Sequence, residues 1–264
     1  MAVRDRTIRS ATQDRRRRLL ELLAGDGPVE IPQLATTLRV SESTVRRDLA
    51  DLERDGQVFR VLGGALTRPI DPSWHQKDRV NADAKARIGV KAASLVGPNS
   101  MVFLDAGTTV ARVAGELAAR EDLTLVTTSL PSLMAIAEGA ATVLVLGGRL
   151  HPNGGRLLGS MASQQLARMA PHVAFLGADS IDPVRGLSCP DLELQVMKSL
   201  IMEVSRTSWV VIDSSKLTIR HPQPYFAPLP PPVGFITETP TTAEGRHMLD
   251  ELRGAGHDVI EVGT

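Results

Sequence analysis

The sequence is poor in several residue types on which particular classes of protein depend. It contains one cysteine, Cys189, in 264 residues, which excludes an internal disulfide and a cysteine-rich metal site. Aromatic residues make up only 3% of the chain, which argues against modules that stack RNA bases and against aromatic-lined peptide grooves. No apolar run approaches the roughly 18 residues of a membrane span, and none of signal-peptide length follows the N-terminal arginines. We therefore expect a folded cytoplasmic chain without a membrane partner.

Charge and histidine content add further limits. The chain has 30 basic and 30 acidic residues, and residues 1–65 carry 12 basic against 10 acidic ones. This small asymmetry permits a basic N-terminal face, so a case for nucleic acid must come from the placement of the charges. The six histidines show no HxxxH spacing and no nearby cluster of carboxylates. We therefore expect no metal centre, and we expect no cofactor.

Three segments with helical periodicity open the chain. Residues 13–23 place leucines behind a charged face. The second segment, in VEIPQLATTL, has a proline suited to a first helical turn and an apolar stripe. The third begins after Ser41, a favourable N-cap, and its Val45, Leu49 and Leu52 recur on one face. This order predicts a helix-turn-helix unit whose last helix is the recognition helix.

The recognition helix carries polar side chains opposite its apolar stripe, and we expect them to contact DNA. They are Ser41, Ser43, Thr44, Arg46 and Arg47. In a helix-turn-helix unit this end of the second helix enters the major groove, where arginine binds guanine edges or phosphates and hydroxyls bind either. The alternative is a solvated face on which the two arginines pair with Asp48, Asp51 and nearby carboxylates.

A strand and a glycine turn follow in QVFRVLGGALTR, which is the pattern of the hairpin in a winged helix. Arg60 on this hairpin would lie near the DNA backbone. The sequence thus predicts a winged helix-turn-helix domain over residues 1–66 and a proline-containing linker over 67–80. Residues 81–264 form the remaining domain.

The remaining domain alternates short apolar runs with helical segments. The runs are MVFLD, LTLVTT, TVLVLGG, VAFLGA, SWVVID, GFITE and DVIEV. Seven buried strands separated by helices predict an α/β domain with a largely parallel sheet. In such a sheet, ligands bind beyond the carboxyl ends of the strands.

Several strand ends carry residues suited to an anionic or hydroxylated ligand. Gly107, Thr108 and Thr109 open a helix whose positive end can hold an anion, although an ordinary helix cap is the alternative. The other candidates are the hydroxyls of Thr127 and Thr128, the close-approach glycines Gly147 and Gly148, and Lys216 as a phosphate partner. Asp179 and Asp182 can accept hydrogen bonds from sugar hydroxyls, or they can be turn residues.

These segments resemble a known family, the DeoR-type bacterial transcriptional regulators. The resemblance rests on LATTLRVSESTVRRDLADLERDGQVFRVLGGAL at the N-terminal end and on FLDAGTT, LVTTSL, LGGRL, FLGADSID, GLSCPDLE and DSSK in the second part. It implies a winged helix followed by a Rossmann-like α/β sensor domain related in fold to sugar-phosphate isomerases. It also implies repression of carbohydrate-metabolism genes, release by a phosphorylated sugar, and sensor-loop roles for the residues above together with Asp105.

Two other classes stay open at this point. One is a sugar-phosphate isomerase-like enzyme that carries a DNA-binding domain, with Asp105 or Asp179 as its general base. The other is an interaction module without a ligand. For a regulator we expect a double-stranded DNA operator and a homodimer or homotetramer, because one winged helix contacts too few bases for operator specificity.

Overall fold

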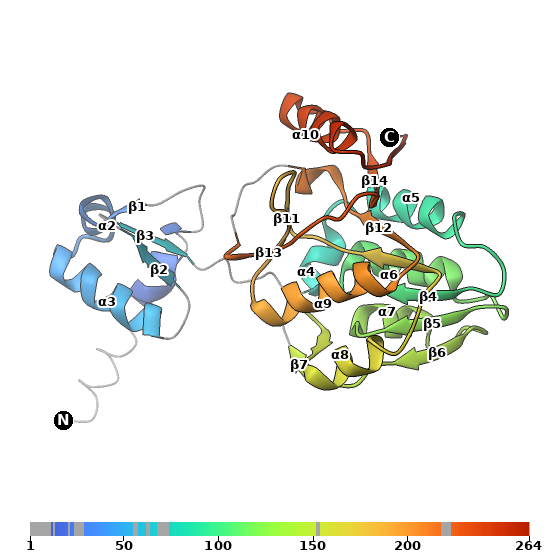
Figure 1. The fold of residues 1–264 in the computed structure, drawn as a ribbon. Coiled ribbons are helices and arrows are strands. Elements are labelled where there is room, and N and C mark those ends of the chain that lie inside the picture. Colours follow the sequence, from blue (N-terminus) through green and yellow to red (C-terminus); the bar gives the residue numbers. More distant parts are fainter. Residues whose placement is uncertain are drawn as a thin grey trace. The chain divides into compact units, whose positions relative to one another are not determined.

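The computed structural model describes residues 12, 14–20, 22–23, 29–54, 58–61, 64–67, 74–151, 154–217 and 223–263. The chain divides into two compact units, Met1–Asp71 and Pro72–Thr264, which we call the N-terminal and C-terminal units (Figure 1). Among the described helices, none has the length and apolar character needed to cross a bilayer.

The N-terminal unit is a winged helix-turn-helix, as predicted. Residues 14–20 are helical, and α2 (Ile31–Leu38) and α3 (Glu42–Arg54) follow. A small antiparallel sheet has the order β1 (Val29–Glu30), β3 (Gly64–Thr67), β2 (Val58–Val61). Arg39 ends α2 in the left-handed conformation, with φ of 54°, and so makes the tight turn into α3.

The core of the N-terminal unit consists of the apolar stripes that the sequence predicts. Its buried members are Leu19, Leu23, Ile31, Leu34, Ala35, Val45, Leu49 and Leu52. They come from all three helices, so each helix turns one apolar face inward. The glycine expected to end α3 and the first glycine of the expected hairpin turn, Gly56 and Gly63, lie outside the described residues.

The C-terminal unit is built on a seven-stranded parallel sheet with the order β15-β14-β12-β9-β4-β5-β6. The strands are β4 (Met101–Leu104), β5 (Thr124–Thr127), β6 (Thr142–Val145), β9 (Val173–Leu176), β12 (Thr207–Val211), β14 (Gly234–Glu238) and β15 (Val259–Val262). All seven predicted strands are confirmed. The prediction that all are buried is wrong for the two edge strands, β6 and β15, in which no residue is buried because each has a neighbouring strand on one side alone.

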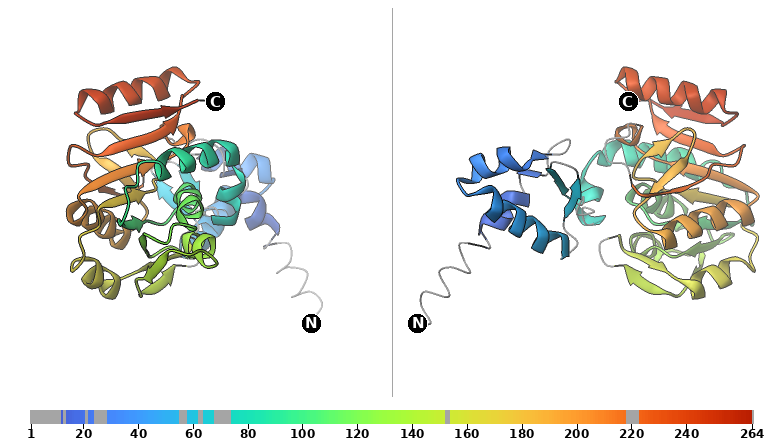
Figure 2. Two further views of the ribbon diagram at one scale, coloured as in Figure 1. Left: turned by 90° about the vertical axis from the view of Figure 1, so that its right-hand side faces the viewer. Right: turned by 60° about the vertical axis from the view of Figure 1, so that its left-hand side comes forward.

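Helices cover both faces of the sheet, as two further views show (Figure 2). The core on one face includes α5 (Ala82–Ala93), α6 (Thr108–Leu117) and α7 (Leu130–Ile136). The core on the other face includes α8 (Ser160–Leu166), α9 (Leu192–Val204) and α10 (Ala243–Gly254). The unit is therefore a three-layered α/β domain.

Short elements follow the carboxyl ends of the strands. They are the hairpin β7 (Arg149–His151) and β8 (Arg156–Leu158), the small sheet of β10 (Ile181–Asp182), β11 (Gly186–Cys189) and β13 (Tyr225–Ala227), and the 3-10 helix η1 (Ser214–Lys216). Strand β4 pairs with β5 on one side and β9 on the other. Helix α6, which follows β4, and α9, which follows β9, pack on opposite faces. This is the switch point at which doubly wound sheets bind ligands.

The predicted linker over 67–80 is wrong in its second half, because residues 74–79 form helix α4 (Trp74–Arg79). This helix lies in the C-terminal unit. The buried Lys85 fixes it, since its Nζ donates to the carbonyl oxygens of Lys77 at 2.5 Å and Val80 at 2.6 Å. Residues 68–73 of the predicted linker lie outside the described residues.

Candidate functional site

The start of α3 presents a cluster of hydroxyl groups. The Oγ atom of Ser41 accepts the backbone N–H of Thr44 at 3.2 Å, which caps the helix as predicted. Within the same cluster, the hydroxyls of Ser43 and Thr44 each lie 2.8 Å from Ser41 Oγ. Ser41 and Ser43 are exposed. These groups are therefore free to exchange their mutual hydrogen bonds for contacts with a phosphate or a base edge.

The two arginines of the recognition helix are exposed and differ in their partners. Arg46 pairs with Glu42 one turn earlier, at 2.7 Å. Arg47 forms no ion pair with any described residue. Opposite charges one turn apart on an exposed helix interact weakly, so DNA can displace Glu42 at small cost.

Two acidic residues of α3, Asp48 and Asp51, pair with arginines of the first helical segment, residues 14–20. Asp48 is 2% exposed and accepts hydrogen bonds from Arg15 Nε at 2.6 Å and Arg16 Nε at 3.3 Å. Arg16 also pairs with Asp51. The hydrogen bond from Asp48 raises the pKa of Arg15. Of the alternative in which Arg46 and Arg47 pair with carboxylates of the helix, the structure shows one contact, Arg46 with Glu42, while Asp48 and Asp51 pair with Arg15 and Arg16. Arg60 belongs to β2, but its side chain is not among the described ones.

At the switch point of the sheet, Asp105 follows β4 and lies in a buried ion pair with Lys198 of α9. The two side chains are 1% and 4% exposed. The Nζ atom of Lys198 also donates to the carbonyl oxygen of Gly177 at 2.6 Å, and Gly177 N–H donates to Asp105 Oδ2 at 3.3 Å. These contacts join the loops after β4 and β9 to α9.

Sequence reasoning missed Lys198, although a signal was present. It lies four residues after Leu194 and three before Ile201, on the buried stripe of α9. A lysine on a buried stripe requires a partner, because an unpaired buried charge is strongly unfavourable.

The predicted anion-binding turn opens α6, as the sequence suggested. Gly107 is the N-cap residue of α6, and no side chain caps the helix there. Thr108 and Thr109 are each 7% exposed. A Cβ on Gly177 would lie 3.6 Å from the Cα of Gly107, so this turn packs directly against the loop after β9. The amides at the uncapped start of α6 remain available to an anion.

The hydroxyls after β5 have different environments. The Oγ1 atom of Thr127 donates to the Leu104 carbonyl at 2.7 Å and accepts Ser129 N–H at 3.0 Å. It therefore links β4 to β5 rather than facing an open site. The carbonyl of Thr128 accepts Leu157 N–H from β8 at 2.7 Å. Its hydroxyl is buried and has no partner among the described residues.

The glycines after β6 have a structural explanation. A Cβ on Gly148 would lie 2.5 Å from the carbonyl oxygen of Leu158, so this glycine permits close approach of β8, whereas a Cβ on Gly147 would meet nothing within 4 Å. Gly147 donates its N–H to Gln165 Oε1 at 3.2 Å. Both contacts hold the β7–β8 hairpin and α8 near the end of β6.

Asp179 and Lys216 lie near the Asp105 network, whereas Asp182 does not join it. Asp179 accepts Lys77 Nζ at 2.7 Å. Burial acts to raise the pKa of Asp179, but the charges of Lys77, Lys216 and Lys198 outweigh burial and hold this pKa below its ordinary value. Lys216 ends η1 and forms no ion pair with any described residue.

Asp182 has the alternative role of a turn residue. It accepts the backbone N–H groups of Val184 at 3.0 Å and Arg185 at 2.9 Å, and Arg185 Nε at 2.7 Å. These bonds close the β10–β11 turn, and they lower the pKa of Asp182 although burial acts to raise it.

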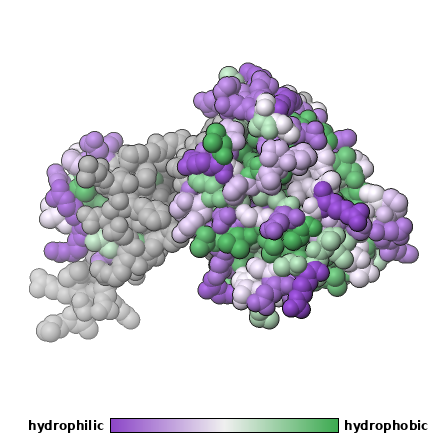
Figure 3. Space-filling model, viewed as in Figure 1, coloured by the Kyte–Doolittle hydropathy of each residue, from purple (hydrophilic) through white to green (hydrophobic). Residues whose placement is uncertain are grey.

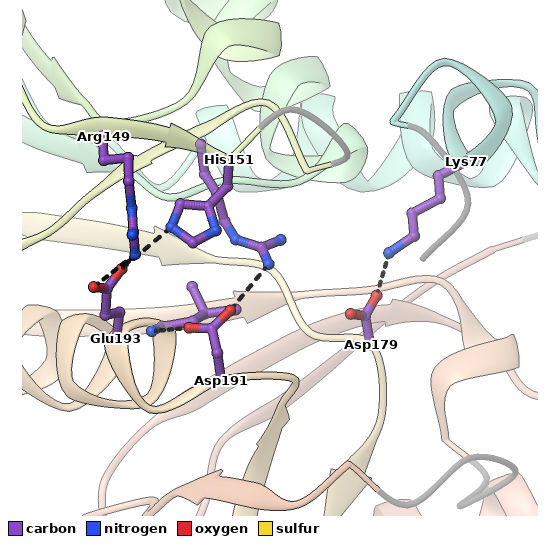
Figure 4. Close-up of polar contacts among 8 residues, drawn as sticks. Lys77, Arg149, His151, Asp179, Asp191 and Glu193 are labelled. Carbon is purple, nitrogen blue, oxygen red and sulfur yellow. Dashed lines mark hydrogen bonds and ion pairs between the residues drawn. The ribbon is translucent and has the colours of Figure 1, made fainter. Parts of the chain in front are cut away.

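A second charged cluster, which sequence reasoning did not find, joins the β7–β8 hairpin to α9 (Figure 4). Glu193 accepts Arg149 at 2.9 Å and lies 3.2 Å from His151 Nε2. The Arg149 hydrogen bond lowers the pKa of Glu193. Asp191 caps α9 and pairs with Arg156 at 3.4 Å. In the part of the chain that the structure describes, His, Cys, Asp and Glu side chains form no group suited to a metal ion.

We call the set of Asp105, Asp179, Lys198, Lys216 and the start of α6 the candidate effector site. It combines lysine ammonium groups and free helix amides with two buried or half-buried carboxylates. The first two suit a phosphate, and carboxylates suit sugar hydroxyls.

Comparison with known proteins covers both units. Residues 15–68 match the DeoR-like helix-turn-helix domain, and residues 80–228 match the DeoR C terminal sensor domain. The putative aga operon transcriptional repressor of Escherichia coli O157:H7 is 32% identical over 213 residues, covering 78% of this chain and 79% of that protein. The lactose phosphotransferase system repressor of Lactococcus lactis subsp. lactis is 31% identical over 206 residues, covering 75% and 80%.

Among solved structures, ribose 5-phosphate isomerase A from Methanocaldococcus jannaschii is similar over 52% of this chain and 54% of that chain, with 19% identity and a TM-score of 0.39. The two family matches follow the same order as the two units of the fold. The chain therefore belongs to the DeoR family of DNA-binding transcriptional regulators.

Proposed function

We propose that this chain represses genes of carbohydrate metabolism and leaves its operator when a phosphorylated sugar binds the C-terminal unit. The observation that carries the proposal is the pair of lysine–aspartate contacts at the switch point, Lys198 with Asp105 and Lys77 with Asp179, together with the uncapped start of α6, which packs against the loop after β9. The relatives named above include a lactose system repressor, which supports a sugar-related signal.

In this proposal the recognition helix and wing supply the operator contacts. The residues are Ser41, Ser43, Thr44, Arg46, Arg47 and Arg60. We expect Arg47 to contribute most to operator binding. It is exposed, and it breaks no ion pair with a described residue before it binds a guanine or a phosphate.

The effector contacts are proposed for the C-terminal unit. The phosphate takes the amides of the α6 start and Lys216, while Asp105 and Asp179 accept sugar hydroxyls. Thr128 joins them through its unpartnered hydroxyl. Thr127, Gly147, Gly148 and Asp182 act indirectly, because their polar groups or their lack of a side chain shape the surrounding loops.

The same charges argue against isomerase chemistry at this site. A general base works best with a pKa near the working pH. Asp105 is held by Lys198, and the pKa of Asp179 lies below its ordinary value. A site that only binds its ligand has no such requirement, so these pairs favour a sensor.

A second copy of the chain completes operator recognition in this proposal, as a homodimer or homotetramer. An apolar band runs over α9 on the face shown in Figure 3. Its members on α8, α9 and β7 are Met161 at 64%, Leu192 at 56%, Val196 at 47% and Leu150 at 50% exposure. A contiguous apolar face of this kind marks a protein interface, so we assign the second copy to it.

The test uses labelled operator DNA, selected by the full chain from a random-sequence library. Fluorescence anisotropy follows release on addition of glucose 6-phosphate, fructose 6-phosphate, fructose 1-phosphate or ribose 5-phosphate, with glucose as the control. The double variant Thr108→Ala with Lys216→Ala should keep operator affinity and need about 100-fold or more of the releasing compound, because two charge-assisted contacts are lost. If the concentration of sugar phosphate that releases wild type also releases this variant, the anion site lies elsewhere.

A further inference from the structure

Helix α4 lies between the two family matches, which end at residue 68 and begin at residue 80. Neither family domain therefore includes it. It is the first described element after the N-terminal unit, and six residues, 68–73, separate it from the end of β3.

Two polar contacts tie this helix to the loops of the candidate effector site. Lys77 Nζ donates to Asp179 Oδ1 at 2.7 Å, after β9 (Figure 4). Asn81, two residues beyond α4, donates from Nδ2 to Asp213 Oδ1 at 2.8 Å, after β12. Asp213 is 2% exposed and begins the turn that carries Lys216. Residues 77 and 81 thus contact the loops at the ends of two strands, β9 and β12.

Two further contacts fix the helix to neighbouring elements. Asp78 accepts Arg112 of α6 at 2.8 Å. A Cβ on Gly155 would lie 3.0 Å from Trp74 Cδ1 and 2.9 Å from Pro131 Cδ, so the indole packs on the β7–β8 hairpin and the start of α7. Helix α4 or Asn81 thus contacts the loops after β9 and β12, α6 and the β7–β8 hairpin.

The Lys77–Asp179 pair is the contact that a ligand can exchange. The two side chains are 24% and 30% exposed, in contrast to the fully buried pair of Lys198 and Asp105. A partly exposed ion pair is easier to replace than a buried one, because solvent and ligands can reach its charged groups. A phosphate can take Lys77 and a sugar hydroxyl can take Asp179 without leaving either charge unpaired.

We propose that Lys77 and Asn81 belong to the effector site and that the ligand acts by exchanging the Lys77–Asp179 pair, which releases α4 from the loop after β9 and lowers operator affinity. This inference rests on the proposed function. A ligand shifts a conformational equilibrium only through a difference in its contacts with the two states, and the pair supplies that difference. The free chain holds α4 through Asp179, and the liganded chain does not.

The first experiment compares three full-length variants by operator anisotropy without any sugar phosphate. Lys77→Met removes the charge and keeps the stem, so it should weaken operator binding by about tenfold, a typical allosteric coupling. Lys77→Arg keeps the pair and should bind like wild type. Arg253→Met is the matched control, because it breaks an ion pair of similar exposure between α10 and β15 and should leave affinity unchanged.

The second experiment reports the movement of α4 directly. Cys189 is buried, and burial raises the pKa of its thiol to about 11, so a cysteine introduced on the surface takes a maleimide fluorophore alone. The exposed Arg79→Cys on α4 carries the label, and the exposed Glu244→Cys on α10 is the control. The sugar phosphate that releases wild-type operator should change the emission of the first label and leave the second unchanged.

The outcomes separate the two proposals. If wild type responds to a sugar phosphate while Lys77→Met keeps full operator affinity and the α4 label stays silent, the role of α4 is wrong and the proposed function stands. If no sugar phosphate of the panel changes operator binding or the melting temperature of wild type, the proposed function is wrong. The inference, which rests on it, is then wrong as well.

Discussion

Replacing Lys198 with methionine removes the positive charge of a buried pair while keeping a side chain of similar length. Among the described residues, Asp105, which is 1% exposed, would then keep the Gly177 N–H as a hydrogen-bond donor at 3.3 Å but no positive charge in contact with it. Removal of one partner from a buried ion pair typically costs about 3–5 kcal/mol, because the remaining charge is neither solvated nor paired. We expect that loss in the free energy of unfolding of the C-terminal unit.

Urea denaturation followed by tryptophan fluorescence measures this loss for the C-terminal unit alone. The chain has two tryptophans, Trp74 and Trp209, and both lie in that unit. With a urea dependence of up to about 3 kcal/mol per molar, the midpoint should fall by at least about 1 M.

The double variant Lys198→Met with Asp105→Asn is the decisive control. It removes both charges and keeps an acceptor for the Gly177 N–H, so it should recover most of the lost stability. A single variant within about 1 kcal/mol of wild type, or a double variant no more stable than the single one, would refute the account of this pair as a buried charge network.

Three other perturbations have defined outcomes. Arg47→Ala should weaken operator binding by about 1–3 kcal/mol per subunit with an unchanged circular dichroism spectrum, and equal affinity at equal salt would contradict the recognition-helix contact. Val196→Asp should give monomers in sedimentation, because a charge enters the apolar band at α9, and an intact oligomer would place the interface elsewhere. Burial lowers the pKa of His257, so stability should fall as pH drops below about 6.5, by at most about 1.4 kcal/mol per pH unit. His257→Asn should lose less stability than wild type between pH 7 and 5, and an identical pH profile would exclude this histidine as the cause.

Periodicity explains why so much of the fold could be predicted from the sequence. The core of the N-terminal unit consists of stripes such as Val45, Leu49 and Leu52, which repeat at helical spacing. The sheet strands are apolar runs bounded by polar turns, and all seven formed where expected. Such patterns depend only on which face of an element is buried, and the local sequence is enough to identify that face.

Contacts between distant elements account for what the sequence did not reveal. Helix α4 has six residues, fewer than two turns, so it has no periodicity to detect. Its main contact, from Lys77 to Asp179, joins residues 102 positions apart. Likewise Gly148 indicates close approach of some backbone, but only the fold identifies β8 as the neighbour. Pairings of this kind depend on topology, which no local pattern encodes.

The charge balance of the candidate effector site suits a switch better than a catalyst. Asp105 and Asp179 are each paired with a lysine before any ligand arrives. In the proposed mechanism, a ligand would exchange the Lys77–Asp179 pair for its own contacts, so the net free energy would be the difference between two similar sets of contacts. DNA could reverse such a difference by binding the other state. The buried pair of Lys198 and Asp105 stays intact and holds the loop after β4 against α9. The partly exposed pair of Lys77 and Asp179 is the contact that changes in the proposal.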